Sequence, residues 1–562
     1  MTQLCNNWQR IGDDDVTTIK QVCLGVAIAG VVAGTGSAVA SAVASADSGS
    51  ADSPGASKSS SSSGSTARSG KPAPKANGVV TGPRRSATAG KAAPAASTAA
   101  PTARRTIAPM KLAAALSLPA PLPAPPLPLA PAGSVTTGTS LRARTAGVTV
   151  INVVNDAVNP TDVHVLVIGV DGTNLRRVIA GDNPNFDALM GDSVTGVASI
   201  VGHTTISNPS WTAILTGAWD NQTGVINNIF TADTYMKWPT VINQLEYFNS
   251  EIDTMVIADW DVITDIAQAG QYPVDTYSLV PQVPGDTNWS LTDAEVTAQT
   301  VAAIGSGEPP NFLFSYLVQV DEAGHQYGGA SPQYAAAINR TDTNIGAIME
   351  AVNTSGENWT VIVVTDHGHQ PQLGFGHGFQ SPDETSTWVI ANGDGFDPGR
   401  MNLAYSIIDV TPTVLSLFGG PPPTGSPGVS LTTLGSSNVL PDDLDQALLD
   451  AIARNGWPDI PTNVALSART IFASIPYFLD GGINSINAAL QGIVDQNIFL
   501  ISQLAAVSKV VVQVLGDVGV AATSALAELV AWMTGVDIFS QGHPLPPPPV
   551  ATEPKTPPVL VA

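Results

Sequence analysis

Short apolar runs that alternate with longer amphipathic stretches dominate residues 160 to 435. Near-continuous Val, Ile, Leu and Phe runs are what strands buried on both faces require, and the stretches between them have helical periodicity. This alternation predicts an α/β sandwich, with a mainly parallel central sheet and helices on both faces. The strand candidates are His164 to Val170, Met255 to Ala258, Phe312 to Val320, Thr360 to Val364 and Thr387 to Ala391, and the helix candidates are Pro239 to Tyr247, Thr292 to Ile304 and Tyr334 to Val352.

Composition divides the 562-residue chain into five parts. The predicted catalytic domain covers residues 147–435, and an Ala/Val/Leu-rich region with helical period covers 436–540. Residues 47–146 are Ser, Ala and Pro runs with few large apolar side chains, which predicts a disordered linker. The Pro-rich tail, 541–562, is predicted to be disordered as well.

The first part, residues 1–46, has the pattern of a signal peptide or a membrane anchor. Residues 22–46 carry no charge and end on Ala44-Ser45-Ala46, which is a small-residue cleavage site. The 25 uncharged residues could also span a bilayer. Either interpretation predicts an exported protein, secreted or attached to the cell envelope.

The helical region at 436–540 is strongly apolar, but charged residues break it. Asp495, Lys509, Asp517 and Glu528 are expected to interrupt every window long enough to span a bilayer. Amphipathic helices that pack on the domain, on a partner or on a lipid surface are therefore favoured over a membrane span.

The net charge of -23 is divided unevenly between the ends of the chain. Residues 1–146 hold 14 Lys+Arg and 5 Asp+Glu, so the remainder has 9 basic against 41 acidic residues and a net charge of -32. An acidic globular part repels a nucleic acid polymer and attracts divalent cations. Because both cysteines, Cys5 and Cys23, stand near the N-terminus, a metal in the domain must be held by His, Asp and Glu.

Residues of this ligand type gather at the carboxyl ends of the predicted strands, where open parallel sheets bind ligands. Four of the seven histidines fall within 53 residues, and a second-shell or solvated role is expected for one of them, His369. Each piece alone is ordinary, since Asp-Gly after a strand is usually a turn, but together they predict a metal centre. The candidate ligands are Asp171, Asp321, His325, Asp366, His367 and His377.

The order of these motifs resembles that of the nucleotide pyrophosphatase/phosphodiesterase family of the alkaline phosphatase superfamily. The motifs are DG after the first strand, D-x-x-G-H-x-Y-G, T-D-H-G and G-H-G, and the resemblance extends over residues 162 to 432. In the family a nucleophilic Thr or Ser is followed by Pro, Thr-Gly, Gly and Asn at fixed spacings. Counting from Ser207, Pro209, Thr216-Gly217, Gly224 and Asn228 match without a gap.

The resemblance implies a hydrolase of small phosphate esters with two divalent metal ions, zinc being the family expectation. One ion would be bound by Asp171, Ser207, Asp366 and His367, and the other by Asp321, His325 and His377. Ser207 would form a phosphoryl-enzyme, because coordination to a cation stabilises its alkoxide. Asn228 would donate a hydrogen bond to a phosphate oxygen.

Several alternatives stay open at this point. Ser207 could merely cap a helix, Thr204 and Thr205 are rival nucleophiles, and Trp211 could be helix packing or a wall for a base. A sulfatase is disfavoured because Trp211 stands where the C/S-x-P-x-R sequence needs Arg. Few arginines are available to clamp a phosphate monoester, which favours a diester or a phosphonate. The alternative from another class is a non-catalytic, metal-binding cell-surface protein.

Overall fold

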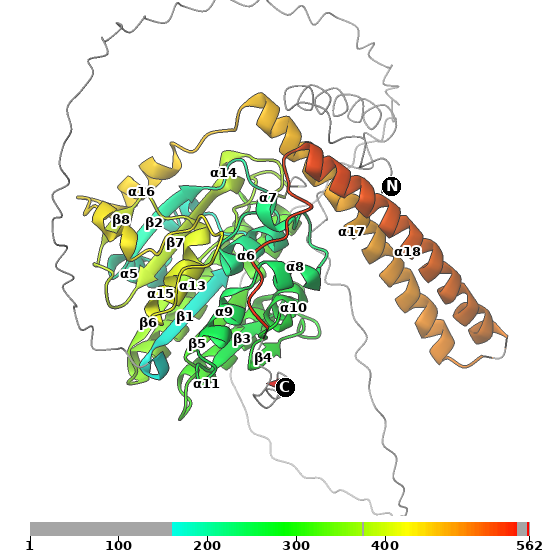
Figure 1. Cartoon of the computed structure of the whole chain (residues 1–562), viewed down its shortest axis with the longest axis horizontal. Helices are drawn as coiled ribbons and strands as arrows, with labels where there is room; N and C mark the ends of the chain where they lie inside the picture. The colour runs from blue at the N-terminus through cyan, green and yellow to red at the C-terminus, as the bar shows by residue number, and fades with distance from the viewer. Residues whose placement is uncertain (1–159, 374–375, 499, 548–558, 561–562) are drawn as a thin grey trace, which may run out of the picture. The chain divides into compact units, whose positions relative to one another are not determined.

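The computed structural model describes residues 160–373, 376–498, 500–547 and 559–560 (Figure 1). The predictions for residues 1–46 and 47–146 lie outside these described residues. Within them the chain forms a nine-stranded sheet in the order β8-β2-β7-β6-β1-β5-β3-β4-β9. The strands are β1 His164–Val170, β2 Val194–Ser199, β3 Thr254–Ala258, β4 Thr276–Leu279, β5 Phe312–Leu317, β6 Trp359–Val364, β7 Ser386–Asn392, β8 Arg400–Asn402 and β9 Val559–Leu560.

Strand β7 is the antiparallel member of the sheet, since it pairs antiparallel with both β2 and β6 while the other neighbours pair parallel. The predicted α/β architecture with a mainly parallel sheet is therefore confirmed. One boundary was wrong: the run from Phe312 to Val320 ends as a strand at Leu317, and a helix begins at Gln319. Strands β2, β4, β8 and β9 were not predicted.

Helices cover both faces of the sheet, as alternate side chains of β1 show. Val165 and Val167 pack into one core with α6, α9, α10 and α15, whereas Leu166 and Ile168 pack into the other with α4, α5, α11, α13 and α16. The helices of this domain are α4 Leu175–Ile179, α5 Pro184–Gly191, α6 Ser207–Thr216, α7 Asp220–Thr223, α8 Ala232–Lys237, α9 Val241–Phe248, α10 Asp261–Gln268, α11 Ser290–Ile304, α12 Gln319–Tyr327, α13 Pro332–Thr354, α14 Pro382–Thr385, α15 Val410–Leu417 and α16 Leu444–Ile452, with 3-10 turns at Pro160–Asp162, Ile407–Asp409 and Thr433–Ser437.

Two long antiparallel helices, α17 (Ile460–Asp495) and α18 (Ile501–Met533), follow the domain and form a hairpin (Figure 1). Their helical character confirms the periodicity of the sequence. Contrary to the expectation that charges interrupt every window, Ser502–Met533 is long and apolar enough to cross a membrane by length and composition. Only 11% of that helix's most apolar window is buried, so most of its side chains face outward.

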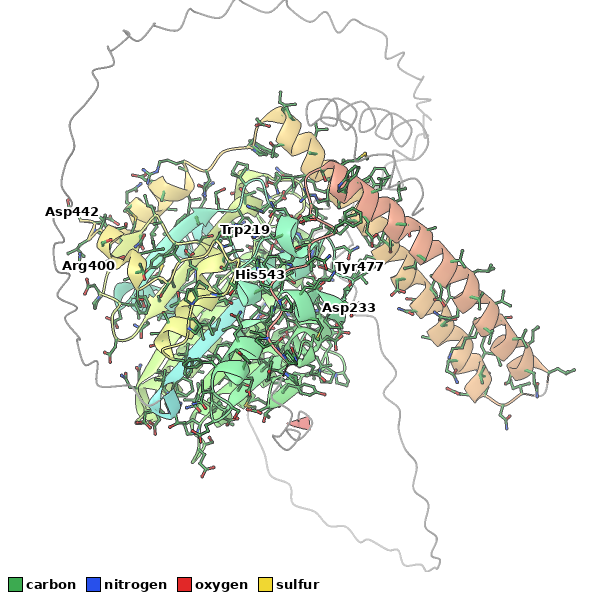
Figure 2. All side chains as sticks on the ribbon, in the orientation of Figure 1. Trp219, Asp233, Arg400, Asp442, Tyr477 and His543 are labelled. Carbon is green, nitrogen blue, oxygen red and sulfur yellow. The ribbon has the colours of Figure 1, made fainter. Side chains whose placement is uncertain are left out.

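Part of the Pro-rich tail lies against the domain, contrary to the prediction of disorder. The His543 backbone N–H donates to the Lys237 carbonyl at 2.7 Å, and its ring meets Trp238 edge-on (Figure 2). The Tyr272 hydroxyl donates to the Pro546 carbonyl at 3.0 Å. These contacts fix the described residues of the tail along α8 and the neighbouring loops.

Candidate metal centre and active site

Asp171 follows β1 directly and is held from two sides. The Trp211 indole N–H donates to its Oδ2 at 2.8 Å, and the Tyr316 hydroxyl donates to the same oxygen at 2.5 Å. Trp211 reaches β1 because residue 169 is glycine: a Cβ there would lie 2.6 Å from the indole ring. Trp211 is fully buried. It therefore orients a carboxylate and packs the helix, and the base-stacking alternative is wrong.

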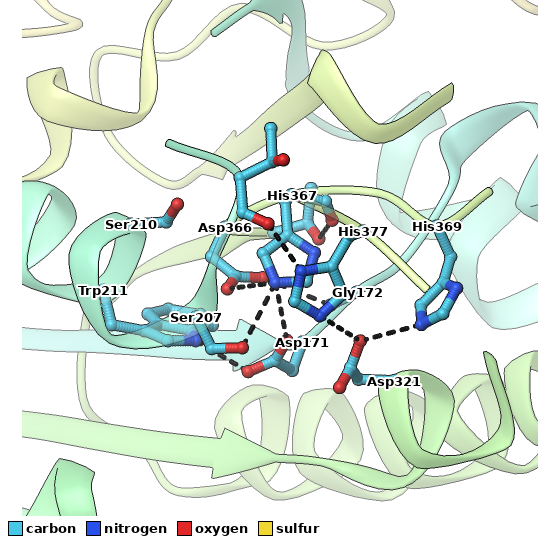
Figure 3. Close-up of polar contacts among 12 residues, drawn as sticks. Asp171, Gly172, Ser207, Ser210, Trp211, Asp321, Asp366, His367, His369 and His377 are labelled. Carbon is cyan, nitrogen blue, oxygen red and sulfur yellow. Dashed lines mark hydrogen bonds and ion pairs between the residues drawn. The ribbon is translucent and has the colours of Figure 1, made fainter. Parts of the chain in front are cut away.

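Ser207 is the first residue of α6, and Ile206 occupies the N-cap position without a side-chain capping bond. The alternative that Ser207 serves as a capping residue is therefore wrong. Its Oγ lies 3.2 Å from His367 Nε2 (Figure 3). At the first helical position the Ser207 side chain lies at the positive end of the helix dipole, which attracts an approaching anion.

The two rival hydroxyls form hydrogen bonds elsewhere. Thr204 Oγ1 donates to Asp220 Oδ2 at 2.7 Å, and Thr205 Oγ1 donates to Glu384 Oε2 at 3.2 Å. The Thr205 oxygen also accepts the Gly378 backbone N–H at 2.9 Å. Of the three hydroxyls, Ser207 is the one that contacts His367.

Asp366 and His367 come just after β6 and meet Asp171. His367 Nε2 lies 3.2 Å from Asp366 Oδ2 and 3.6 Å from Asp171 Oδ1. The other ring nitrogen, Nδ1, is 3.0 Å from the Gly368 carbonyl, which can only accept a hydrogen bond. This contact favours a proton on Nδ1 and directs the Nε2 lone pair at Ser207 and the two carboxylates.

Asp321 and three histidines form a second group beside the first. Asp321 lies in the first turn of α12 rather than at a strand end, and His325 one turn later approaches its Oδ2 at 3.1 Å. His377 Nε2 lies 3.2 Å from His325 Nε2 and 3.7 Å from Asp321 Oδ1. Two sets of side chains could each hold a metal ion, with ligand atoms within 4.8 Å of one another: Asp321, His325, His369 and His377, and Asp171, Asp321 and His367.

His369 departs from the expectation of a second-shell or solvated role. It is fully buried, and its Nε2 lies 3.3 Å from Asp321 Oδ1, among the atoms of the second group (Figure 3). Burial lowers the pKa of His369 to about 4, so the ring is neutral, which is the form that binds metals. Its position two residues after His367, at the end of a buried strand, was the signal that could have marked it.

The charges of the site call for a cation. Burial, and then repulsion from Asp171 and Asp321, hold the pKa of Asp366 well above its usual range. Burial also opposes ionisation of Asp321, but the neighbouring rings, His325 first, outweigh it and hold the pKa of Asp321 well below its usual range. Three buried carboxylates and the imidazoles beside them are the oxygen and nitrogen donors of divalent metal sites. The residues present therefore fit such ions.

Asn228 lies beside the start of α6. Its Oδ1 accepts the backbone N–H of Asn208 at 3.0 Å, and the side chain is buried. This bond fixes the amide plane and leaves the NH₂ group of Asn228 as the donor.

A cavity of about 700 Å³ opens over Asp171, Ser207 and Asp321. Among the described residues that line it, none is Lys or Arg. Its lining includes aromatic and acidic residues, which are Trp260, Trp289, Tyr316, Asp259, Asp261, Asp286 and Glu322.

Residues 165–375 match the family model described as type I phosphodiesterase / nucleotide pyrophosphatase. This part of the chain is similar to the phosphodiesterase/nucleotide pyrophosphatase family. The chain is 23% identical over 224 residues to human ectonucleotide pyrophosphatase/phosphodiesterase family member 7, covering 36% of this chain and 47% of that protein. It is 23% identical over 229 residues to an uncharacterized pyrophosphatase/phosphodiesterase of Schizosaccharomyces pombe, covering 39% and 47%. The chain thus spans about half the length of the curated relatives it matches.

Two solved structures are similar to the domain. Murine ectonucleotide pyrophosphatase/phosphodiesterase 5, as an inactive variant in complex with AMP, has a TM-score of 0.40 and 14% identity and covers 49% of this chain and 100% of that chain. A protein of the alkaline phosphatase superfamily from Vibrio parahaemolyticus has a TM-score of 0.39 and 18% identity and covers 48% and 70%.

The root of α17, well beyond the family match, contacts the site through two adjacent residues. Arg469 Nη1 donates to Asp220 Oδ2 at 2.7 Å, and Thr470 Oγ1 donates to the Gly378 carbonyl at 2.7 Å. Asp220 holds Thr204, and Gly378 follows His377, whose Nδ1 lies 2.5 Å from the Thr205 carbonyl. The first turns of α17 therefore hold the neighbours of both partners in the contact between His377 and the Thr205 carbonyl. No sequence motif pointed to these two residues.

Proposed function

We propose that the protein is a metal-dependent hydrolase of phosphodiester or nucleotide pyrophosphate bonds that acts through a covalent phosphoryl-Ser207 intermediate on two divalent ions. One observation supports this most directly. The Ser207 hydroxyl, at the start of α6, lies 3.2 Å from His367 Nε2 on the floor of a cavity, beside two clusters of metal-binding side chains.

The roles of the chain's own residues follow from their positions. Ser207 Oγ attacks phosphorus, a P–Oγ bond forms, and the bond to the leaving alcohol or nucleotide oxygen breaks. Water then hydrolyses the seryl ester and releases the phosphate product. The amide of Asn228 donates a hydrogen bond to a non-bridging oxygen, and the positive end of the α6 dipole stabilises the charge of the phosphoryl group.

The ligands would be divided between two metal ions as the resemblance to the family implies. Asp171, Ser207, Asp366 and His367 would hold one ion, and Asp321, His325 and His377, with His369 beside them, would hold the other. When bound, divalent ions such as zinc stabilise the seryl alkoxide and the charge that develops on the leaving oxygen.

The cavity favours a substrate with an organic group on each side of phosphorus. A phosphate monoester is doubly charged and is usually clamped by Arg or Lys, neither of which lines the described cavity. Trp260 and Trp289 instead offer apolar faces to an ester group. A phosphodiester is therefore favoured over a monoester, and a phosphonate ester is the alternative of similar charge.

The test compares bis-p-nitrophenyl phosphate with p-nitrophenyl phosphate on the full chain with zinc. Turnover of the diester that exceeds turnover of the monoester, is lost with chelator and is lost in Ser207→Ala supports the proposal. Ser210→Ala, one turn along the same helix, is the matched control and should keep activity, because its hydroxyl donates to the Thr204 carbonyl rather than to the site. Stoichiometric zinc without turnover of either ester, or of a phosphonate ester, would favour the metal-binding surface protein. Export remains a prediction from residues 1–46.

A further inference from the structure

We propose that the α17–α18 hairpin pairs with the hairpin of a second copy of this chain, through one apolar face, to form a four-helix bundle.

Exposed apolar side chains repeat along both helices at intervals of three and four residues. On α18 the repeat is Leu504, Val507, Val511, Val514 and Val518, all exposed, with 68% of Leu504 and 65% of Val518 accessible. On α17 the repeat is Leu479, Gly482, Ile486, Ala489 and Ile493, exposed as well. Apolar residues that alternate at three and four places form the seam of a coiled coil.

Both repeats emerge on the same side of the hairpin. Most of these residues stand one residue before a buried or half-buried position, as Ile486 does before Asn487 and Leu504 before Ala505. The helices are antiparallel, as the Asn487–Gln513 and Gln491–Lys509 hydrogen bonds show. A step back of one residue turns about 100° around each helix, and in an antiparallel pair the two turns lead to the same face.

The opposite face is largely polar, although Val510 is exposed on it. On α17 it presents Asp480, Asn484 and Asp495, and on α18 it presents Gln513 and Asp517. Solvent can therefore cover one face, whereas the other presents a continuous apolar surface.

The size of the apolar face suits a dimer. The repeat on α18 is continued by the exposed Ala521 and Ala525, so that residues 504 to 525 cover about 30 Å at 1.5 Å per residue, and two helices side by side are about 20 Å wide. The face is thus roughly 600 Å², and two copies would bury about 1,200 Å², which is the lower bound of a specific protein–protein interface.

Charge and composition favour a second copy over a lipid surface. From residue 477 to 533 the chain has a single cation, Lys509, against Asp480, Asp495, Asp517 and Glu528. Neither repeat contains Lys, Arg or an aromatic residue, which helices at a membrane surface use at the headgroups. Small and β-branched side chains at three-four spacing instead suit close helix–helix packing.

The test is sedimentation velocity of the full chain between 1 and 50 µM in detergent-free buffer. This concentration range is chosen because an interface of minimal size is expected to have a dissociation constant of about micromolar order. We expect a dimer for the wild type and for Val510→Glu, and a monomer or an at least about tenfold weaker dimer for Val511→Glu. Val510 is the matched control because it is as exposed as Val511, 62% against 50%, but stands seven residues before Asp517 and so shares the polar face. Circular dichroism checks that both variants keep their helices.

Three outcomes would overturn the proposal. A monomeric wild type would do so, as would a dimer that Val511→Glu leaves intact, since it must then form elsewhere. Flotation of a monomeric wild type with phosphatidylcholine/phosphatidylglycerol vesicles, abolished by Val511→Glu, would assign the face to a membrane instead.

Discussion

Replacing Arg469 with Met tests whether the root of α17 supports the catalytic domain. The Arg469–Asp220 pair is 2.7 Å long with both side chains at most 4% exposed, and Thr534 accepts two further bonds from the guanidinium. Removing one partner of such a pair leaves a buried charge and costs about 3–5 kcal/mol. Because His203 and Thr204 still bond to Asp220, we expect the lower end, about 3 kcal/mol.

This loss converts into a measurable temperature. With an unfolding entropy of about 2 cal/mol/K per residue, about 380 cooperating residues give about 0.8 kcal/mol/K, so the midpoint in calorimetry should fall by about 4 °C. The Arg176→Met variant is the control, because its pair with Asp383 is 3.7 Å long and half exposed and should contribute about 0–1 kcal/mol. Arg469→Met combined with Asp220→Asn should recover part of the loss.

Zinc retention should change with stability in the same variant. Asp220 holds Thr204, and the next carbonyl, that of Thr205, contacts His377 Nδ1. Arg469→Met should therefore release zinc to a chelator faster than the wild type. If Arg469→Met lowers the midpoint no more than Arg176→Met does, the reasoning about the buried pair is refuted.

Three further predictions concern Thr470, Asp366 and Asp409. Thr470→Val removes the hydrogen bond to the Gly378 carbonyl and should cost about 1–2 kcal/mol in chemical denaturation and speed zinc loss, whereas Thr470→Ser should restore both. Chelation should lower the unfolding midpoint of the wild type more than that of Asp366→Asn, since the variant has one fewer buried carboxylate to repel Asp171 and Asp321; equal shifts would contradict this. Burial raises the pKa of Asp409 to about 6 from 3.8, so the stability that its protonated form contributes is complete below about pH 4 and is lost as pH rises through about 6. The stability of the wild type relative to Asp409→Asn should therefore fall by about 1–3 kcal/mol between pH 4 and pH 8, and a flat difference would refute the assignment.

The central strands could be predicted from the sequence because both of their faces are buried. His164–Val170 matched to the residue, and the strand that ends at Val364 began one residue earlier than expected. The strand beginning at Phe312 was made too long because the apolar run continues through Val318, the N-cap of α12, and Val320 in its first turn, both of which are buried as well. Where a strand and the helix that follows it are both fully buried, the apolar residues run on without a break, and their spacing does not show where the strand ends.

The unpredicted strands have a different cause. Val194–Ser199 contains Thr, Gly, Ala and Ser, and Arg400–Asn402 is three residues long. Such segments become strands through pairing with a neighbour, as Val194 does with Ala391, and pairing between residues so distant in the chain leaves no local pattern.

The candidate site divides in the same way. Strand-end reasoning pointed to Asp171, Asp366 and His367, because parallel strands deliver their carboxyl ends to one edge. His369 was predicted to lie outside the ligand set because the prediction followed the family motif and did not consider burial. Arg469 and its partner Asp220 are 249 residues apart in the sequence. Because arginine is usually exposed to solvent, an arginine in a helix-forming stretch is not expected to be buried, and no sequence pattern indicated this contact.

The helical region beyond the family match therefore has two separable parts. Its root is buried in the domain, where Arg469 and Thr470 reach the loops on both sides of His377, two residues past the end of the matched segment. Its distal part makes a hairpin whose apolar face is uncovered in the described chain. The same helix, α17, forms the root and one half of that face, with Pro476 between them, so an effect of association at the hairpin on the metal cluster can be tested directly. If Val511→Glu loses the dimer but retains zinc as the wild type does, association at the hairpin does not affect the metal cluster. If the dimer and zinc retention change together, it does.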